Sequence, residues 1–256
     1  MNRSDTETAR LALACLDLTS LNDDDTEAQI DALCERAADP IGAPAALCVW
    51  PRLARHAAAQ APAGVRIAAV ANFPDGSTDA ERAARDTAQC VQAGAHEVDV
   101  VLPWRALLAG DDATAARVLR AARRACEGRV LKVILETGEL KDPAAITRAA
   151  RLALAEGADF LKTSTGKVPV NATPASATLL LQAIAADPAA RTRVGFKAAG
   201  GIRSVADAAA YLALVEEHLG ATALGPARFR FGASGLWNDI AAVLGGSARP
   251  ASSRAY

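Results

Sequence analysis

Short apolar runs alternate with longer amphipathic stretches along most of the chain. The runs are rich in Val, Ile and Leu and do not alternate strictly with polar residues, which is typical of parallel strands buried on both faces. The pattern predicts strands at residues 11–16, 45–50, 65–70, 97–102, 130–136, 159–163, 194–198 and 229–232. It predicts helices at residues 26–37, 52–61, 79–93, 113–126, 144–155, 174–186, 205–219 and 236–244.

A strand followed by a helix, repeated eight times, predicts an α/β protein with a (β/α)8 TIM barrel as a single domain over residues 1–256. A doubly wound sheet is the alternative. That fold normally carries a G-x-G-x-x-G loop after an early strand, and none follows the first three candidate strands. The residues from about 246 onward are small or polar and predict a loose tail.

Composition narrows the class of protein. Hydrophobic residues make up 51% of the chain and charged residues 22%, which is ordinary for a soluble globular protein. The net charge of −1 gives no broad basic field, so neither nucleic acid nor a membrane is expected as a partner. The five cysteines have no C-x-x-C pair and the three histidines have no ligand spacing, so we expect no metal site and a cytoplasmic protein.

Ionisable residues occur within or at the ends of several predicted strands, where a barrel gathers its chemistry. They are Asp17, Asp99, Glu136, Lys162 and Lys197. For any one of them, a buried charge satisfied by a neighbour is an equally good explanation. Buried ion pairs add little stability, however, so their accumulation on separate strands favours a function.

Two lysines that meet in a barrel suggest one kind of catalysis. A free lysine has a pKa near ~10.4 and is therefore protonated at neutral pH. An apolar surround and a second cation both disfavour the ammonium form. A neutral amine can add to an aldehyde or ketone to form a Schiff base, and a nearby carboxylate such as Asp99 can move the protons.

Glycine-bearing turns follow the last three predicted strands, at residues 165–167, 199–203 and 232–235. Turns at these places, leading into helices, form the common phosphate site of barrels. Each turn alone is also explained as an ordinary strand-to-helix connection. Three on adjacent strands predict a phosphorylated substrate, with Lys167 or Arg203 adding charge.

Six segments of the chain together resemble the class I, Schiff-base-forming deoxyribose-phosphate aldolases. The segments run in order from about residue 13 to 244: LDLTSLNDDDT, EVDVVLPWRALLAG, LKVILETGELKD, ADFLKTSTGKVPVNATP, VGFKAAGGIRS and RFRFGASGL. The resemblance implies a metal-free barrel without a cofactor. It also implies reversible cleavage of 2-deoxy-D-ribose 5-phosphate into D-glyceraldehyde 3-phosphate and acetaldehyde, as in deoxyribonucleotide and carbohydrate degradation.

The resemblance also implies roles for particular residues. Lys162 would form the Schiff base, Lys197 would lower its pKa and join the proton relay, and Asp99 would donate and accept protons. The implied substrate-lining residues are Asp17, Asn22, Cys48 and Thr165. The implied phosphate contacts are Gly166, Lys167, Gly200, Gly201, Arg203, Gly232 and Ser234. A homo-oligomer is expected, since dimers and tetramers are common for barrels.

The chain departs from the family pattern at two places and shares a terminal tyrosine with some members. Ala198 stands where proline often precedes A-G-G, and Gly235 stands where a second serine often contacts phosphate. Tyr256 ends the chain and is a possible proton shuttle, but a solvent-exposed tail explains it equally well. Two alternatives stay open: a lysine-dependent barrel aldolase acting on a keto-phosphate, and a non-catalytic sugar-phosphate binding barrel.

Overall fold

Eight parallel strands close into one barrel in the computed structural model of the chain, which describes residues 3–245. The predicted (β/α)8 barrel is therefore confirmed. Each strand pairs with its neighbours in chain order, and β8 closes the barrel on β1. The strands are β1 Leu16–Thr19, β2 Ala46–Val49, β3 Arg66–Ala71, β4 Glu97–Val101, β5 Val130–Ile134, β6 Phe160–Lys162, β7 Gly195–Ala199 and β8 Phe229–Ala233.

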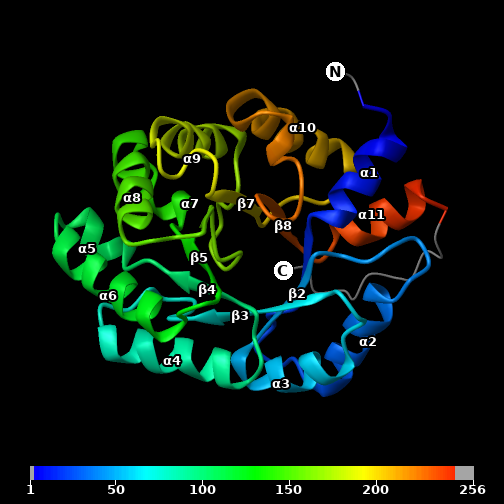
Figure 1. Cartoon of the computed structure of the whole chain (residues 1–256), viewed down its shortest axis with the longest axis horizontal. Helices are drawn as coiled ribbons and strands as arrows, with labels where there is room; N and C mark the ends of the chain where they lie inside the picture. The colour runs from blue at the N-terminus through cyan, green and yellow to red at the C-terminus, as the bar shows by residue number, and fades with distance from the viewer. Residues whose placement is uncertain (1–2, 246–256) are drawn as a thin grey trace.

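Helices surround the barrel and cover the outer face of its sheet (Figure 1). The longer ones are α1 Asp5–Ala14, α2 Glu27–Ala37, α3 Pro51–Gln60, α4 Ala80–Gln92, α6 Asp112–Ala125, α8 Pro143–Ala155, α9 Pro174–Ala186, α10 Val205–Leu219 and α11 Leu236–Val243. Three short ones are α5 Trp104–Leu108, α7 Thr137–Leu140 and the 3-10 helix η1 Ala221–Ala223. Within the described part of the chain, no helix combines the length and the apolar character that crossing a membrane requires.

The first predicted strand, at residues 11–16, is wrong. Most of that segment belongs to α1, and the strand β1 begins only at Leu16. A capping box starts α1: the Ser4 hydroxyl accepts from the Glu7 N–H at 3.3 Å, and the Glu7 carboxylate accepts from the Ser4 N–H at 2.8 Å. The helix packs against α10 and α11, so its apolar residues are buried by helices and not by the sheet (Figure 1).

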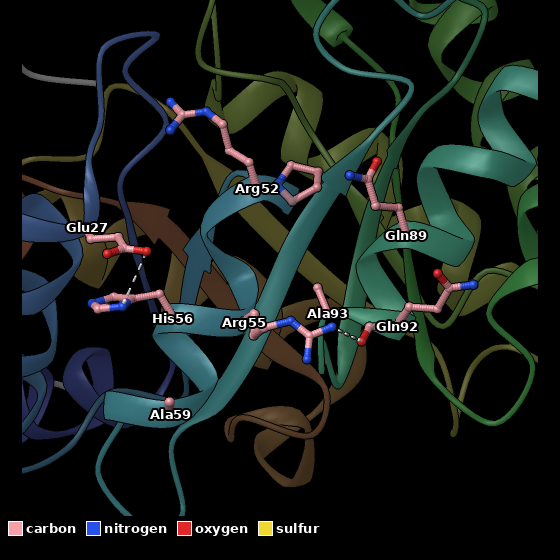
Figure 2. Close-up of a pocket in the computed structure, with 9 residues that line it drawn as sticks. Glu27, Arg52, Arg55, His56, Ala59, Gln89, Gln92 and Ala93 are labelled. Atoms are coloured by element: carbon pink, nitrogen blue, oxygen red, sulfur yellow. Dashed lines mark hydrogen bonds and ion pairs between the residues drawn. The ribbon is translucent and has the colours of Figure 1, made fainter.

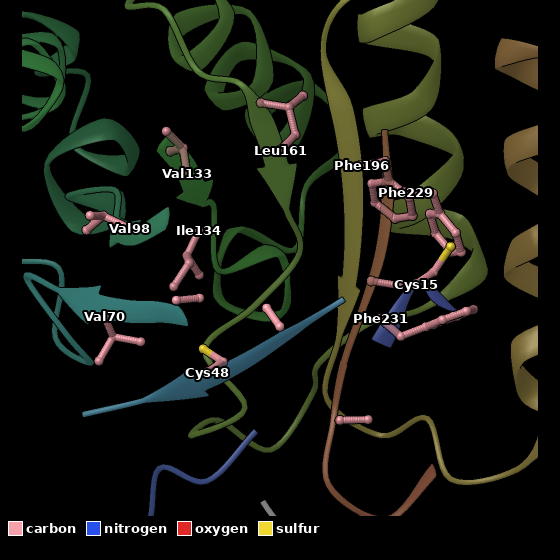
Figure 3. Close-up of a cluster of buried hydrophobic side chains, with 14 of the residues drawn as sticks. Cys15, Cys48, Val70, Val98, Val133, Ile134, Leu161, Phe196, Phe229 and Phe231 are labelled. Carbon is pink, nitrogen blue, oxygen red and sulfur yellow. The ribbon is translucent and has the colours of Figure 1, made fainter. Parts of the chain in front are cut away.

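Side chains alternate between the two faces of the strands more strictly than the sequence pattern suggests. On β8, the rings of Phe229 and Phe231 meet edge to face with centroids 4.6 Å apart, and Phe229 stacks on Phe196 of β7 at 6.1 Å. Figure 3 shows these three rings gathered beside β7 and β8. Arg230 lies between the two β8 phenylalanines in sequence and reaches carboxylates of β1 and β4 inside the barrel. The apolar core therefore lies between sheet and helices, and charge fills the barrel.

Candidate active site

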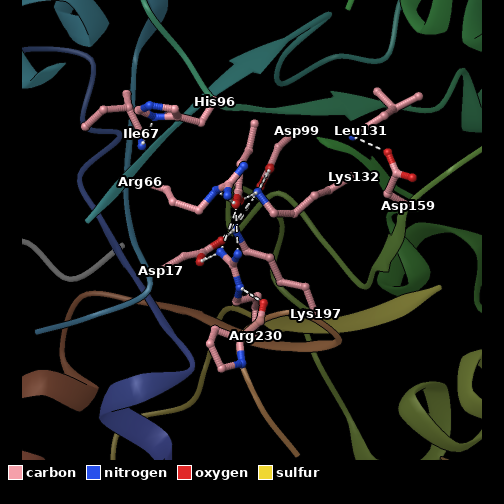
Figure 4. Close-up of polar contacts among 12 residues, drawn as sticks. Asp17, Arg66, Ile67, His96, Asp99, Leu131, Lys132, Asp159, Lys197 and Arg230 are labelled. Carbon is pink, nitrogen blue, oxygen red and sulfur yellow. Dashed lines mark hydrogen bonds and ion pairs between the residues drawn. The ribbon is translucent and has the colours of Figure 1, made fainter. Parts of the chain in front are cut away.

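Charged side chains from six strands meet inside the barrel. Figure 4 shows those of Asp17, Asp99, Lys132, Lys197 and Arg230 pointing toward one another. Most of them stand between apolar neighbours on their own strand, so the alternation that buries the neighbours under the helices turns the charge inward. They are fully or almost fully buried: Asp17, Glu97, Asp99, Lys132, Lys162, Lys197 and Arg230. The structure thus brings together the three residues predicted to be catalytic, Asp99, Lys162 and Lys197.

One carboxylate oxygen joins the two predicted catalytic lysines. Asp99 Oδ2 accepts from Lys162 Nζ at 3.0 Å and from Lys197 Nζ at 2.8 Å. The two lysines are paired in register on β6 and β7. Lys197 also donates to Asp17 Oδ2 at 2.5 Å, so it lies between two carboxylates.

These contacts drive the two lysine pKa values in opposite directions. Burial lowers the pKa of Lys162, and the neighbouring Lys197 cation lowers it further, against the pull of Asp99. Burial also disfavours the charge of Lys197, but Asp17 and Asp99 raise its pKa well above the usual value. Asp99 is likewise buried, yet Lys132, Lys197 and Lys162 hold its pKa well below the usual value. Lys197 is therefore the ammonium and Lys162 the amine that deprotonates more readily.

A second layer of ion pairs lies beside this trio, and sequence analysis assigned no role to its cations. Lys132 Nζ is 2.7 Å from both Asp99 Oδ1 and Glu97 Oε2. Arg230 bridges Glu97, at 2.8 Å, and Asp17, at 2.5 Å. The signal was present in the sequence, because each of these charges interrupts a strand that is otherwise apolar.

The numbers of buried charges single out one lysine. Four buried cationic side chains face three buried carboxylates in this cluster. Lys162 pairs only with Asp99, through an oxygen that also accepts from Lys197, whereas each of the other buried cations pairs with two carboxylates or more. Loss of the Lys162 proton leaves three buried cations facing three buried carboxylates, with the half-exposed Arg66 pairing with Glu97 from outside, and an unpaired buried charge is costly. The arrangement therefore favours a neutral amine at position 162.

Two glycines on the inner face make room for these side chains. A Cβ at Gly195 would lie 2.4 Å from the Phe160 ring, over which the Arg230 guanidinium carbon stands at 5.6 Å. A Cβ at Gly232 would lie 2.9 Å from Lys197 Cε. Gly232 was predicted as a phosphate contact, and in the structure its missing side chain is what lets Lys197 reach Asp17.

The other predicted substrate-lining residues have partners within the protein. Asn22 donates its amide to Asp25 Oδ1 at 3.0 Å, within the loop after β1. Cys48 is buried among the barrel residues (Figure 3), and burial raises the pKa of its thiol. The Thr165 hydroxyl donates to Glu136 Oε2 at 2.5 Å. Substrate contact by these residues stays a prediction.

The predicted phosphate contacts follow β6, β7 and β8, three neighbouring strands, and so lie along one rim of the barrel. Among the described residues, the backbone N–H groups of Gly166, Gly201 and Ser234 have no acceptor. The N–H of Gly200 is already donated to Gly232 O at 3.1 Å. Lys167 Nζ lies 3.4 Å from Asp23 Oδ1. Arg203 is exposed after β7.

Two predictions about the end of the chain are left without a structural test. The loose tail from about residue 246 and the possible proton shuttle Tyr256 both lie outside the described residues.

A separate surface hollow lies away from the lysines, between α2, α3 and α4 (Figure 2). His56 pairs there with Glu27 at 3.7 Å, and Arg55 donates to the Gln92 carbonyl at 3.3 Å. Its wall is made of helix side chains, so it is distinct from the charged interior of the barrel.

Comparison with known proteins identifies relatives over nearly the whole chain. The model of the DeoC/LacD family of aldolases matches residues 11–237. The deoxyribose-phosphate aldolase of Agrobacterium fabrum is 49% identical over 243 residues, which cover 94% of this chain and 93% of that protein.

Solved structures of similar proteins agree. A putative deoxyribose-phosphate aldolase from Toxoplasma gondii superposes with a TM-score of 0.84 at 26% identity, covering 93% of each chain. The deoxyribose phosphate aldolase of Aeropyrum pernix, described as a tetramer, superposes with a TM-score of 0.68 at 26% identity, covering 94% of this chain and 91% of that one.

Proposed function

The chain belongs to the DeoC/LacD family of aldolases, and we propose that it reversibly cleaves 2-deoxy-D-ribose 5-phosphate into D-glyceraldehyde 3-phosphate and acetaldehyde. As an aldolase it is a lyase. The observation that carries the specific proposal is the position of Lys162, which pairs with one carboxylate, whereas each of the other buried cations of the cluster pairs with at least two. Its amine is suited to imine formation with an aldehyde.

In the cleavage direction, Lys162 Nζ adds to the aldehyde carbon of the open-chain sugar, and loss of water leaves an iminium ion. The iminium accepts the electron pair of the C2–C3 bond while the C3 hydroxyl gives up its proton. D-Glyceraldehyde 3-phosphate leaves, and an enamine remains on Lys162. A proton is then added at C2, and water releases acetaldehyde and restores the amine.

Asp99 and Lys197 carry the protons in this scheme, together with a water molecule. Lys197 suits the acid role because its two carboxylate partners keep it charged. Asp99 Oδ2 accepts from both Lys162 and Lys197, so a change of charge on one lysine alters the pKa of the other.

The other end of the substrate would lie along the rim after β6 to β8. The free N–H groups of Gly166, Gly201 and Ser234 would donate to the phosphate, and Lys167 and Arg203 would supply positive charge. Gly200 would contribute by its small size, since its N–H is used within the protein.

The chain is also proposed to act as a homo-oligomer in the cytoplasm. The oligomer rests on the tetrameric description of the A. pernix relative. The compartment rests on composition, and all five cysteines are buried and unpaired.

Reductive trapping tests the proposal. The protein is incubated with acetaldehyde and borohydride and then digested, and the peptides are analysed by mass spectrometry. An ethyl group on Lys162 is expected, together with cleavage of 2-deoxyribose 5-phosphate. A Lys162→Ala variant should lose activity by orders of magnitude while remaining folded.

The same experiment separates the alternatives. Trapping by a phosphorylated ketone and not by acetaldehyde would indicate a keto-phosphate aldolase. No adduct at any lysine would indicate a binding protein without aldolase chemistry.

A further inference from the structure

Glu136 is a buried carboxylate that the proposed reaction does not use. It follows β5 directly, its residue is 1% exposed, and its backbone is left-handed with φ of 58°. A left-handed backbone is unfavourable for a residue with a Cβ and persists where surrounding contacts hold it. Unlike the carboxylates of the charged cluster, Glu136 forms no ion pair among the described residues.

Both oxygens of Glu136 are taken by one residue of the next strand's loop. Oε1 accepts from the Thr165 N–H at 3.1 Å, and Oε2 accepts from the Thr165 hydroxyl at 2.5 Å. The same hydroxyl accepts from the Lys167 N–H at 3.0 Å. Hydrogen bonds to a carboxylate are stronger than neutral ones, and bonds in series reinforce one another. A continuous chain of bonds therefore runs from Glu136 to the backbone of Lys167.

The hydroxyls that precede Thr165 hold the opposite side of the loop. The Ser164 hydroxyl donates to Ala199 O at 2.5 Å, and the Thr163 hydroxyl accepts from Ala199 N at 3.0 Å. The base of the loop is also tied to β5 through the backbone, because Thr137 N–H donates to Thr163 O at 2.9 Å. Glu136 is thus the side chain that holds Thr165, the residue that follows Ser164, and through it the backbone of Lys167.

We propose that Glu136 is a positioning residue that holds Gly166 and Lys167 at a fixed distance from Lys162, and so selects substrates that carry a terminal phosphate. The inference rests on the proposed function, in which Lys162 reacts with the carbonyl and the loop binds the phosphate. Glu136 touches neither end of the substrate in this scheme. It acts through Thr165, whose hydroxyl proton is committed to the carboxylate.

The neutral variant Glu136→Gln tests the inference, because its amide can accept only one of the two bonds from Thr165. We expect KM for 2-deoxyribose 5-phosphate to rise about tenfold or more with kcat little changed, since a bond to a charged acceptor is lost. kcat/KM for unphosphorylated 2-deoxyribose should stay within about twofold. Ethyl trapping on Lys162 should also be unchanged.

Matched variants separate positioning from general damage. Thr165→Val removes the hydroxyl and should show the same selective loss, whereas Thr165→Ser keeps the hydroxyl and should retain more of the preference for the phosphorylated sugar than Thr165→Val does. Adding Thr165→Val to Glu136→Gln should cost little more, because both break one chain of bonds. Glu127→Gln makes the same charge change at an exposed position in the turn after α6, away from this chain of bonds, and should change the KM of neither substrate.

Two results would overturn the inference: an equal loss on both substrates, or no loss on the phosphorylated one. If Glu136→Gln does not fold, the inference is tested by comparing Thr165→Val with Thr165→Ser in their KM for 2-deoxyribose 5-phosphate and their kcat/KM for unphosphorylated 2-deoxyribose. Failure of the proposed function would look different, because the parent protein itself would then neither cleave 2-deoxyribose 5-phosphate nor trap acetaldehyde.

Discussion

Lys162 and Lys197 donate to a single oxygen of Asp99, at 3.0 and 2.8 Å, from neighbouring strands in register. Only Lys197 has a second carboxylate, Asp17, at 2.5 Å. Two residues of the same type, side by side, therefore differ in how readily each loses a proton. The proposed nucleophile, Lys162, is distinguished from Lys197 by the number of carboxylates it contacts.

Replacing Lys197 by methionine should raise the pKa of Lys162, because the repelling cation is lost and Asp99 Oδ2 is left to Lys162 alone. The free amine is the reactive form, so the acid limb of kcat/KM should move to higher pH by about one unit or more. The pH dependence of kcat/KM measures the shift. Lys167→Met should raise KM for the phosphorylated sugar and leave the limb in place; a limb that moves equally in both variants would contradict the assignment.

Replacing Asp99 by asparagine should destabilise the protein, because it leaves Lys132 and Lys197 each short of one carboxylate in a buried cluster. Breaking a buried pair in this way costs about 3–5 kcal/mol. Urea unfolding measures the loss. Glu81→Gln breaks the exposed pair with Arg85 and should cost less than about 1 kcal/mol. Equal losses of unfolding free energy in the two variants would mean that the buried cluster contributes no more to stability than an exposed ion pair does.

The stability of the parent protein should also fall in acid. The folded-state pKa of Asp99 lies well below its usual value near ~3.9, although burial opposes this, because three lysines surround it. Its stabilising contribution is therefore complete above the unfolded pKa and is lost as the pH falls through the folded one. Unfolding free energies measured below about pH 4 should decline less steeply in Asp99→Asn than in the parent. If the unfolding free energy falls with pH equally steeply in both proteins, Asp99 is not a main source of the loss of stability in acid.

A methyl group at position 232 should displace Lys197, because its Cβ would lie 2.9 Å from both Lys197 Cε and the Ala199 Cβ. We expect Gly232→Ala to lower kcat by about a hundredfold, the cost of moving a catalytic group by about 1 Å. Gly225→Ala adds the same methyl group where no atom lies within 4 Å, and it should leave kcat unchanged. Steady-state kinetics compare the two; full activity in Gly232→Ala would show that Lys197 tolerates displacement.

Asp23 should compete with the phosphate for Lys167, since their side chains lie 3.4 Å apart and Asp23 is almost fully exposed. Exposed pairs are worth about 0.2–1 kcal/mol, so Asp23→Asn should lower KM for the phosphorylated sugar by about 1.4-fold to fivefold. Unphosphorylated 2-deoxyribose should be unaffected. Glu127→Gln makes the same charge change elsewhere and should alter neither KM. An unchanged KM in Asp23→Asn would place Lys167 away from the phosphate.

Much of the fold could be predicted because each barrel strand is a short apolar run between helices with a clear period. The failures were local. Residues 11–14 are apolar enough for a strand, and the deciding signal was the capping pair of Ser4 and Glu7 upstream. The helices α5 and α7 have five and four residues, too few for a helical period to be recognised.

The candidate site was predicted where a motif carried it and missed where only closure of the barrel creates it. Lys162, Lys197 and Asp99 lie in segments that resemble the family. The place of Arg230 in the site depends on closure of β8 on β1, which brings its guanidinium to Asp17, 213 residues away in sequence. Likewise, the partner of Glu136 lies 29 residues later on the next strand's loop. Pairings of this kind depend on register, which a single sequence does not specify.

The charges inside the barrel also limit how the pocket can be redesigned. Lys132 pairs with Asp99 and Glu97, and Arg230 pairs with Glu97 and Asp17, so each of these two cations neutralises charge on two carboxylates. A single replacement of one of these charged residues, made to admit a new carbonyl compound, would leave its partner as an uncompensated buried charge. Engineering of this enzyme should therefore replace a buried carboxylate and its cationic partner together. Alternatively, changes can be confined to the loops, where water can solvate a charge that has lost its partner.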